Sequence, residues 1–129
     1  MNKTAMELVK EAKAEIREMD LQQAHGKHQS EEVVIIDVRE THEFSGGHIP
    51  GAHHISRGML EFKADSHPAL KDKDREILVY CKTGGRAALA AQQLKKMGYT
   101  NVHSIQGGMD AWDAVSYTHL RAHETRHDI

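Results

Sequence analysis

Two short, almost wholly apolar runs rich in β-branched residues constrain the fold of this chain most strongly. Residues 33–38 read VVIIDV, and residues 76–81 read EILVYC. Strands buried on both faces have this composition, and parallel sheets are built from such strands. A weaker run, NVHSI at residues 101–105, follows the helical sequence RAALAAQQLKKMGY, in which Gly98 is placed to end the helix. Strand, helix and strand in this order imply a parallel crossover, so we expect a three-layer α/β domain with helices on both faces of a mainly parallel sheet.

The N-terminal segment predicts helices ahead of these strands. Apolar residues between positions 5 and 19 recur at three- and four-residue steps, which indicates one amphipathic helix. Thr4, with Glu7 three residues later, has the spacing of a capping box. A shorter helix is expected to begin after Asp20 and to end at Gly26.

Composition excludes several classes of protein. With 129 residues the chain can bury a core of its own, and a formal net charge of -2 gives no reason to expect a nucleic-acid partner. No stretch approaches the ~18 apolar residues of a membrane span, and the N-terminus lacks the apolar run of a secretion signal. The single cysteine, Cys81, cannot form an internal disulfide, so we expect a reducing, cytoplasmic setting.

The C-terminal segment does not continue the pattern of the rest. Residues 115–125 read VSYTHLRAHET, which resembles the translation of a transposase sequencing adapter. We therefore divide the chain into a domain at residues 1–114, which includes the N-terminal helix, and a non-native tail at residues 115–129.

The loop that contains the cysteine carries the chemistry. Cys81 ends a predicted buried strand, and a helix is expected to begin about five residues later. Ligands of open α/β sheets bind outside this end of the strands. Gly84 and Gly85 can adopt backbone angles that other residues avoid, so the loop can turn several N–H groups toward one point. The helix N-terminus adds further unpaired N–H groups and the positive end of its dipole, so this point should hold an anion.

A thiolate is such an anion, and the loop also contains candidate cations. Lys82 and Arg86 flank the glycines, and Arg86 can hold an oxyanion through two parallel hydrogen bonds. A helix N-terminus beside cations favours the ionised form of a cysteine. The alternative is an inert cysteine that fills the core. The order of cysteine, glycines, cations and helix start favours a nucleophile.

The residues from Cys81 to Arg86, CKTGGR, resemble the six-residue active-site loop of rhodanese-type sulfurtransferases. The upstream run IIDVRETHEFSGGHIPGAHHI and the later IQGGMDAW resemble two further signatures of that family. The resemblance covers nearly all of residues 33–112 and is strongest to the small single-domain bacterial forms. It implies a five-stranded, mainly parallel sheet flanked by helices.

The resemblance also implies a mechanism. Cys81 would attack the outer sulfur of thiosulfate or a similar small donor, and the resulting persulfide would pass its sulfur to cyanide or a thiol, with a protein acceptor as a further option. The loop residues Lys82, Thr83, Gly84, Gly85 and Arg86 would bind the substrate, because their N–H groups would hold the anionic sulfur. Arg86 and Lys82 would orient the incoming anion. This scheme requires no cofactor.

Two other functions use the same loop. A persulfide carrier or a regulatory binding module would receive sulfur from a partner and hand it on. Related dual-specificity phosphatases have one more residue between Cys and Arg, which makes room for a phosphate. Here four residues, 82–85, separate Cys81 from Arg86, so a phosphatase is the less favoured interpretation.

Other polar residues are interpreted as structural. In the family pattern, Asp37 and Arg39 form a pair that supports the loops around the active site, and His48 fixes a turn by hydrogen bonding. The eleven histidines include the adjacent pair His53 and His54. Neighbouring residues on a strand point to opposite faces and cannot easily chelate one ion, so we expect no metal site.

Overall fold

The computed structural model describes residues 2–30 and 32–114, so the tail assigned to residues 115–129 lies outside the described residues. The strands are β1 (Arg17–Met19), β2 (Val34–Asp37), β3 (His53–His54), β4 (Ile77–Tyr80) and β5 (Val102–Ile105). The α-helices are α1 (Ala5–Glu15), α2 (Leu21–His28), α3 (Thr41–Ser45), α4 (Leu60–Ala64) and α5 (Gly85–Lys96), and the 3₁₀ helices are η1 (Arg57–Met59) and η2 (Pro68–Leu70). Residues 108–114 are also helical.

The strands form one five-stranded sheet in the order β1-β5-β4-β2-β3, and every neighbouring pair is parallel. In the centre, Ile35 of β2 pairs with Leu78 of β4, and Val79 of β4 pairs with Ser104 of β5. The expected parallel α/β fold is confirmed. Because all strands run in one direction, the segments that leave β2, β4 and β5 emerge at the same edge of the sheet.

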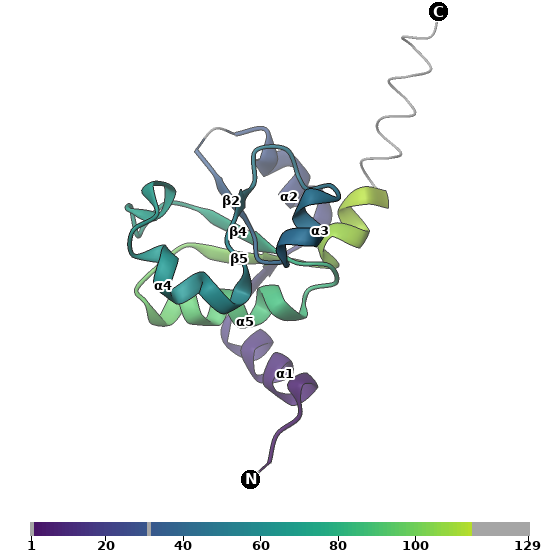
Figure 1. Ribbon diagram of the computed structural model, residues 1–129, viewed down its shortest axis with the longest axis vertical. Coiled ribbons are helices and arrows are strands. Elements are labelled where there is room, and N and C mark those ends of the chain that lie inside the picture. Colours follow the sequence, from purple (N-terminus) through teal and green to yellow (C-terminus); the bar gives the residue numbers. More distant parts are fainter. Residues whose placement is uncertain (1, 31, 115–129) are drawn as a thin grey trace, which may run out of the picture.

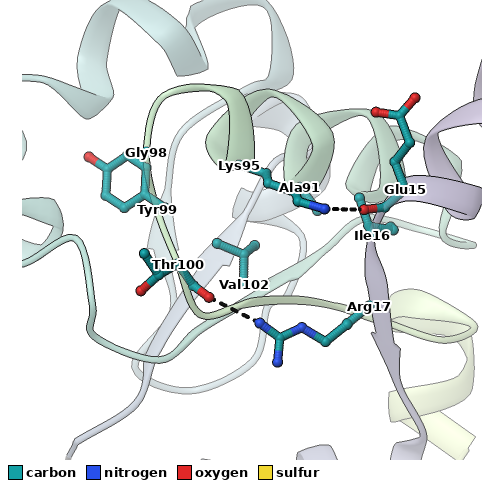
Figure 2. Close-up of a pocket in the computed structure, with 9 residues that line it drawn as sticks. All are labelled: Glu15, Ile16, Arg17, Ala91, Lys95, Gly98, Tyr99, Thr100 and Val102. Atoms are coloured by element: carbon teal, nitrogen blue, oxygen red, sulfur yellow. Dashed lines mark hydrogen bonds between the residues drawn. The ribbon is translucent and has the colours of Figure 1, made fainter.

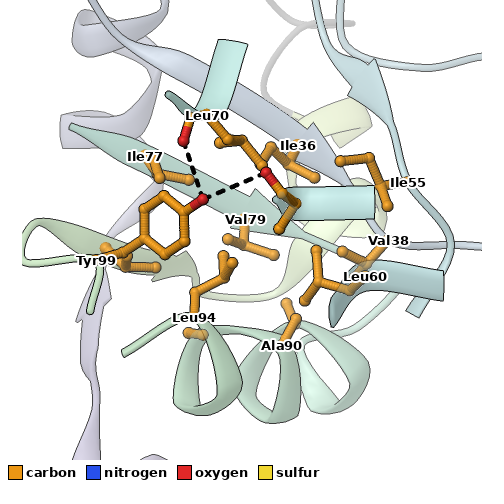
Figure 3. Close-up of a cluster of buried hydrophobic side chains, with 14 of the residues drawn as sticks. Ile36, Val38, Ile55, Leu60, Leu70, Ile77, Val79, Ala90, Leu94 and Tyr99 are labelled. Atoms are coloured by element: carbon orange, nitrogen blue, oxygen red, sulfur yellow. Dashed lines mark hydrogen bonds between the residues drawn. The ribbon is translucent and has the colours of Figure 1, made fainter. Parts of the chain in front are cut away.

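One face of the sheet packs against α4 and α5 (Figure 1). Figure 3 shows this core, in which Val79 of the central strand β4 is buried together with Leu60 of α4 and Leu94 of α5. The Tyr99 hydroxyl, at the rim of the cluster, donates to the carbonyl oxygen of Leu70 at 2.9 Å. A buried tyrosine thereby keeps a hydrogen-bond partner while its ring fills the core.

The other face of the sheet packs against α2 and the helix at residues 108–114. Trp112 and Met109 of that helix and Ala24 of α2 are buried with Leu78 and Tyr80 of β4. Apolar side chains thus leave both faces of β4, which explains why its sequence has no polar alternation. The three predicted layers are present. None of the helices in the described part of the chain combines the length and apolar character that a membrane crossing requires.

The N-terminal helix is confirmed at its start and is shorter than expected at its end. Glu7 N–H donates to Thr4 Oγ1 and Thr4 N–H donates to Glu7 Oε1, both at 3.1 Å, which is the predicted capping box. The helix ends at Glu15, and Met19 instead belongs to β1, where it pairs with Ile105 of β5. Pairing with the sheet edge therefore overrides the helical periodicity of this segment.

The second helix is longer than expected. Asp20 caps it, since Gln23 N–H donates to Asp20 Oδ1 at 2.8 Å. The predicted end at Gly26 is wrong, because α2 continues to His28. A glycine lowers helix stability without necessarily ending the helix.

Candidate active site

Cys81 lies where the sequence predicts it, directly after β4 at the carboxyl ends of the parallel strands. Its side chain is buried, and α5 begins four residues later at Gly85. The sulfur accepts two backbone hydrogen bonds, from Gly84 N–H at 3.1 Å and from Ala87 N–H at 3.3 Å. Gly84 has φ +121°, a conformation that glycine adopts readily and other residues rarely. The loop therefore curls around the sulfur and presents N–H donors to it.

Further backbone N–H groups of the same loop are free to bind a ligand. The backbone N–H groups of Lys82, Thr83, Gly85 and Arg86 make no hydrogen bond within the described part of the chain. The last two belong to the first turn of α5, where the helix itself offers no partner. The positive end of the α5 dipole adds to the field of these donors. The loop can thus hold a second anionic atom beside the sulfur.

The Arg86 guanidinium is engaged by a carboxylate that the sequence interpretation missed. Its Nη1 and Nη2 donate to Oε1 and Oε2 of Glu43 in α3, at 2.7 and 3.0 Å. The Arg86 guanidinium, with help from the Glu40 N–H, lowers the pKa of Glu43 to about 2, and Glu43 raises the pKa of Arg86. Both groups therefore stay charged across the neutral range, and they form a two-pronged ion pair beside Cys81.

The second loop cation is paired as well. Lys82 Nζ donates to Oδ1 of Asp110 at 3.0 Å, and both side chains are exposed. An exposed pair of this kind is weak and is screened by salt. Each of the two cations expected to orient the substrate thus has a carboxylate partner, Glu43 for Arg86 and Asp110 for Lys82. Thr83, the remaining predicted contact, is exposed.

The helix at residues 108–114 abuts the cysteine loop through its backbone. Met109 N–H donates to the carbonyl oxygen of Cys81 at 2.7 Å, and Asp110 N–H donates to that of Lys82 at 3.1 Å. Gly108 has φ +58°, and a Cβ built there would lie 2.4 Å from the Cys81 carbonyl oxygen. Only a glycine allows this approach. The two glycines of IQGGMDAW were the available sequence signal, but their role depends on which segment packs against them.

Asp37 and Arg39 form a buried pair at the end of β2. Arg39 Nη2 donates to Asp37 Oδ2 at 2.8 Å, and its Nε lies 3.0 and 3.1 Å from the two carboxylate oxygens. Arg39 Nη2 also donates to the Gly47 carbonyl oxygen at 2.7 Å, and the His54 ring donates to the Arg39 carbonyl oxygen at 2.7 Å. The hydrogen bond to Asp37 raises the pKa of Arg39. The pair thereby ties β2 to the loop that leads to β3.

His48 lies in that loop and contacts α3. Its Nδ1 donates to the carbonyl oxygen of Phe44 at 3.0 Å, and its ring stacks on the Phe44 ring at a centroid distance of 3.7 Å. Of the adjacent histidines, His53 is exposed and packs edge-on against His67, whereas His54 stacks on Phe44. Among residues 2–30 and 32–114 there is no cluster of acidic, histidine or cysteine side chains suited to a metal ion.

Two hollows among the described residues have no cysteine in their lining. One, of about 400 Å³, is lined by residues at the end of α5 and the starts of β1 and β5, which is the opposite edge of the sheet (Figure 2). Lys95 Nζ donates there to the Glu15 carbonyl oxygen at 2.8 Å, and Arg17 Nη2 donates to that of Thr100 at 3.0 Å. Lys95 thus satisfies the carbonyl group at the end of α1, and Arg17 satisfies one in the segment between α5 and β5. This hollow is a gap between packed elements.

The sequence matches a known family. The family model of the rhodanese-like domain matches residues 20–115. The chain belongs to the rhodanese-like domain family.

Solved structures agree with this assignment. A protein of unknown function from Rhodopseudomonas palustris, described as a possible tyrosine phosphatase, shares 33% identity with a TM-score of 0.81, over 90% of this chain and 93% of that one. The human single-domain sulfurtransferase TSTD1 shares 26% identity with a TM-score of 0.68, over 74% and 93%. A rhodanese-related protein from Thermoplasma volcanium, at 24% identity with a TM-score of 0.62 over 74% and 89%, shares the fold.

Proposed function

We propose that this rhodanese-like domain is a sulfurtransferase with Cys81 as its nucleophile. It moves sulfane sulfur from thiosulfate or a similar small donor to a thiol or cyanide, in the reducing cytoplasm of a bacterial cell. The observation that carries the proposal is the environment of one atom. Cys81 Sγ accepts hydrogen bonds from the N–H groups of Gly84 and Ala87, and the loop around it has further N–H donors that have no partner among the described residues. Such an arrangement stabilises a thiolate and the anion formed from it.

The reaction proceeds in two displacements. The Cys81 thiolate attacks the outer sulfur of thiosulfate, a new S–S bond forms, and the old S–S bond breaks with its electron pair on the departing sulfite. The product is a Cys81 persulfide anion, and the total charge of minus three is unchanged. An acceptor thiolate or cyanide then attacks the terminal sulfur and regenerates the Cys81 thiolate. This is ping-pong covalent catalysis, and attack by a thiolate needs no general base.

The remaining residues have supporting roles in this scheme. The N–H groups of Lys82, Thr83, Gly85 and Arg86 hold the terminal sulfur of the persulfide. Asp37, Arg39 and His48 hold the loops on which the site is built, through the contacts to Gly47 and Phe44. None of them exchanges a proton with the substrate.

A phosphatase is the second candidate, because a relative that shares 33% identity is described as a possible tyrosine phosphatase. Two features disfavour it here. Only residues 82–85 separate Cys81 from Arg86, one fewer than in the related phosphatases, and the Arg86 guanidinium is already held by both oxygens of Glu43. A phosphate needs both the wider loop and the free guanidinium.

Thiocyanate formation from thiosulfate and cyanide tests the proposal, with Cys81→Ser as the negative variant. The proposal predicts turnover in the wild type that is lost in Cys81→Ser. Hydrolysis of p-nitrophenyl phosphate without thiocyanate formation would instead establish the phosphatase. A stable persulfide on Cys81 without turnover would favour the alternative, a carrier or regulatory module.

A further inference from the structure

Each of the two cations in the cysteine loop has a carboxylate partner. Arg86 is matched by Glu43 and Lys82 by Asp110, so these two ion pairs bring no net positive charge to the loop. The uncompensated positive potential comes from the loop amides and from the α5 dipole, which amounts to about half an elementary charge. Such a site is suited to one negative charge in addition to the thiolate sulfur.

Glu43 keeps its negative charge beside Arg86. Its side chain is 19% exposed and both of its oxygens contact Arg86, which keeps the carboxylate charged at neutral pH. Glu40 N–H also donates to Glu43 Oε1 at 3.0 Å, which fixes the carboxylate from its own helix. A dianion that approaches Arg86 therefore approaches a fixed negative charge as well.

We propose that Glu43 is a specificity-determining residue that directs the site toward monoanionic sulfane donors, such as the persulfide anion of a small thiol, and away from dianionic donors such as thiosulfate. This inference rests on the proposed sulfurtransferase function. The chemistry of the first step is unchanged. With a thiosulfonate anion, R–SO₂–S⁻, the Cys81 thiolate takes the terminal sulfur, the S–SO₂ bond breaks, and its electron pair leaves on the sulfinate, R–SO₂⁻.

Two donors of nearly equal size test the inference. Methanethiosulfonate replaces one charged oxygen of thiosulfate with a methyl group, so the pair differs mainly by one negative charge. Their leaving groups differ in intrinsic reactivity, so the informative quantity is the ratio of the two kcat/KM values and its change between variants. Glu43→Gln keeps the size of the side chain and removes the charge beside Arg86.

We expect Glu43→Gln to raise kcat/KM for thiosulfate relative to methanethiosulfonate by about five- to tenfold, because the uncovered guanidinium then attracts the second charge. Glu43→Asp retains the charge and should retain the wild-type ratio. Glu76→Gln is the matched control. Glu76 is equally buried, at 18% exposure, and is paired with Lys27, but it precedes β4 at the opposite edge of the sheet. Its removal should leave the ratio unchanged.

Ionic strength gives a second measurement that needs no variant. For the wild type we expect kcat/KM to depend on salt equally weakly for both donors, since the fields of the paired charges cancel. A steep loss of thiosulfate activity with salt in the wild type, or an equal effect of Glu43→Gln on both donors, would overturn the role of Glu43. Absence of thiocyanate formation from both donors in the wild type would instead refute the sulfurtransferase function.

Discussion

The backbone of Gly108 lies so close to the carbonyl oxygen of Cys81 that a side chain at position 108 has no room. A Cβ at Gly108 would lie 2.4 Å from the carbonyl oxygen of Cys81 and 2.6 Å from that of Lys82. The same approach lets Met109 N–H donate to the Cys81 carbonyl oxygen at 2.7 Å. The helix that follows β5 thereby holds the backbone from which the reacting sulfur projects.

The first prediction concerns Gly108→Ala. The methyl group would force the helix away from the loop, and φ +58° disfavours a side chain in any case. We expect the free energy of unfolding to fall by about 2–4 kcal/mol. We also expect sulfur transfer to slow by about 10- to 100-fold, because a small displacement of a catalytic group is costly. Urea unfolding and thiocyanate formation measure the two effects.

Gly26→Ala is the control, for which we expect stability to increase and not to decrease. Gly26 lies inside α2, no atom lies within 4 Å of the position that a Cβ would take there, and its φ is not positive. Alanine is the better helix former, so we expect the free energy of unfolding to rise by about 0.5–1 kcal/mol with unchanged activity. Equal losses of activity in Gly26→Ala and Gly108→Ala would contradict a specific role for Gly108.

The apolar runs of the sequence predicted the bounds of the three central strands closely, and no such run marks the bounds of the two edge strands. The three apolar runs lie within one residue of β2, β4 and β5 at each end, because burial on both faces leaves a strong local signature. β1 has three residues and β3 has two, and each exists only through pairing with a longer neighbour. A pairing of this kind leaves little trace in the residues themselves.

The residues of the site that belong to one contiguous loop could be predicted from the sequence, and the residues that other elements bring to it could not. Cys81 and the Gly84 donor follow from one contiguous loop, whose order of residues carries the chemistry. Glu43 and Gly108 reach that loop from other elements, α3 and the helix after β5. Their contribution depends on how these elements pack against α5 and β4, which no spacing in the sequence encodes.

The second prediction concerns the buried pair of Asp37 and Arg39. Arg39→Gln would leave the Asp37 carboxylate without its counter-charge, in a position with 0% side-chain exposure. Removing one partner of a buried ion pair costs about 3–5 kcal/mol, and we expect a loss of that size in urea unfolding. Arg17→Gln is the control, because Arg17 is exposed and donates to the uncharged carbonyl oxygen of Thr100, so the loss of stability should be within about 0.5 kcal/mol. Similar losses in both variants would contradict this account.

The third prediction is a pH dependence of stability at His67. Its Nδ1 accepts a hydrogen bond from Ala69 N–H at 3.1 Å and must be unprotonated to do so. Burial, with smaller contributions from His53 and Lys63, lowers the pKa of His67 below its ordinary value of 6.5. The unfolded chain therefore binds this proton more readily, and the stability contributed by His67 decreases as the pH falls through about 6.5.

His67→Asn tests this dependence, because asparagine can cap the same N–H group without titrating. Urea unfolding at pH 7.5 and pH 5 should show a smaller loss of stability on acidification in His67→Asn than in the wild type. An unchanged loss would show that His67 does not contribute to the acid sensitivity of the fold.

The central claim is that Cys81 accepts and holds a sulfane sulfur, and intact-protein mass spectrometry after donor treatment tests it most directly. We predict a gain of about 32 Da, one sulfur atom, that peptide mapping places on Cys81, that cyanide removes, and that Cys81→Ser does not show. No gain in mass after treatment with thiosulfate, methanethiosulfonate or a small-thiol persulfide would contradict the account.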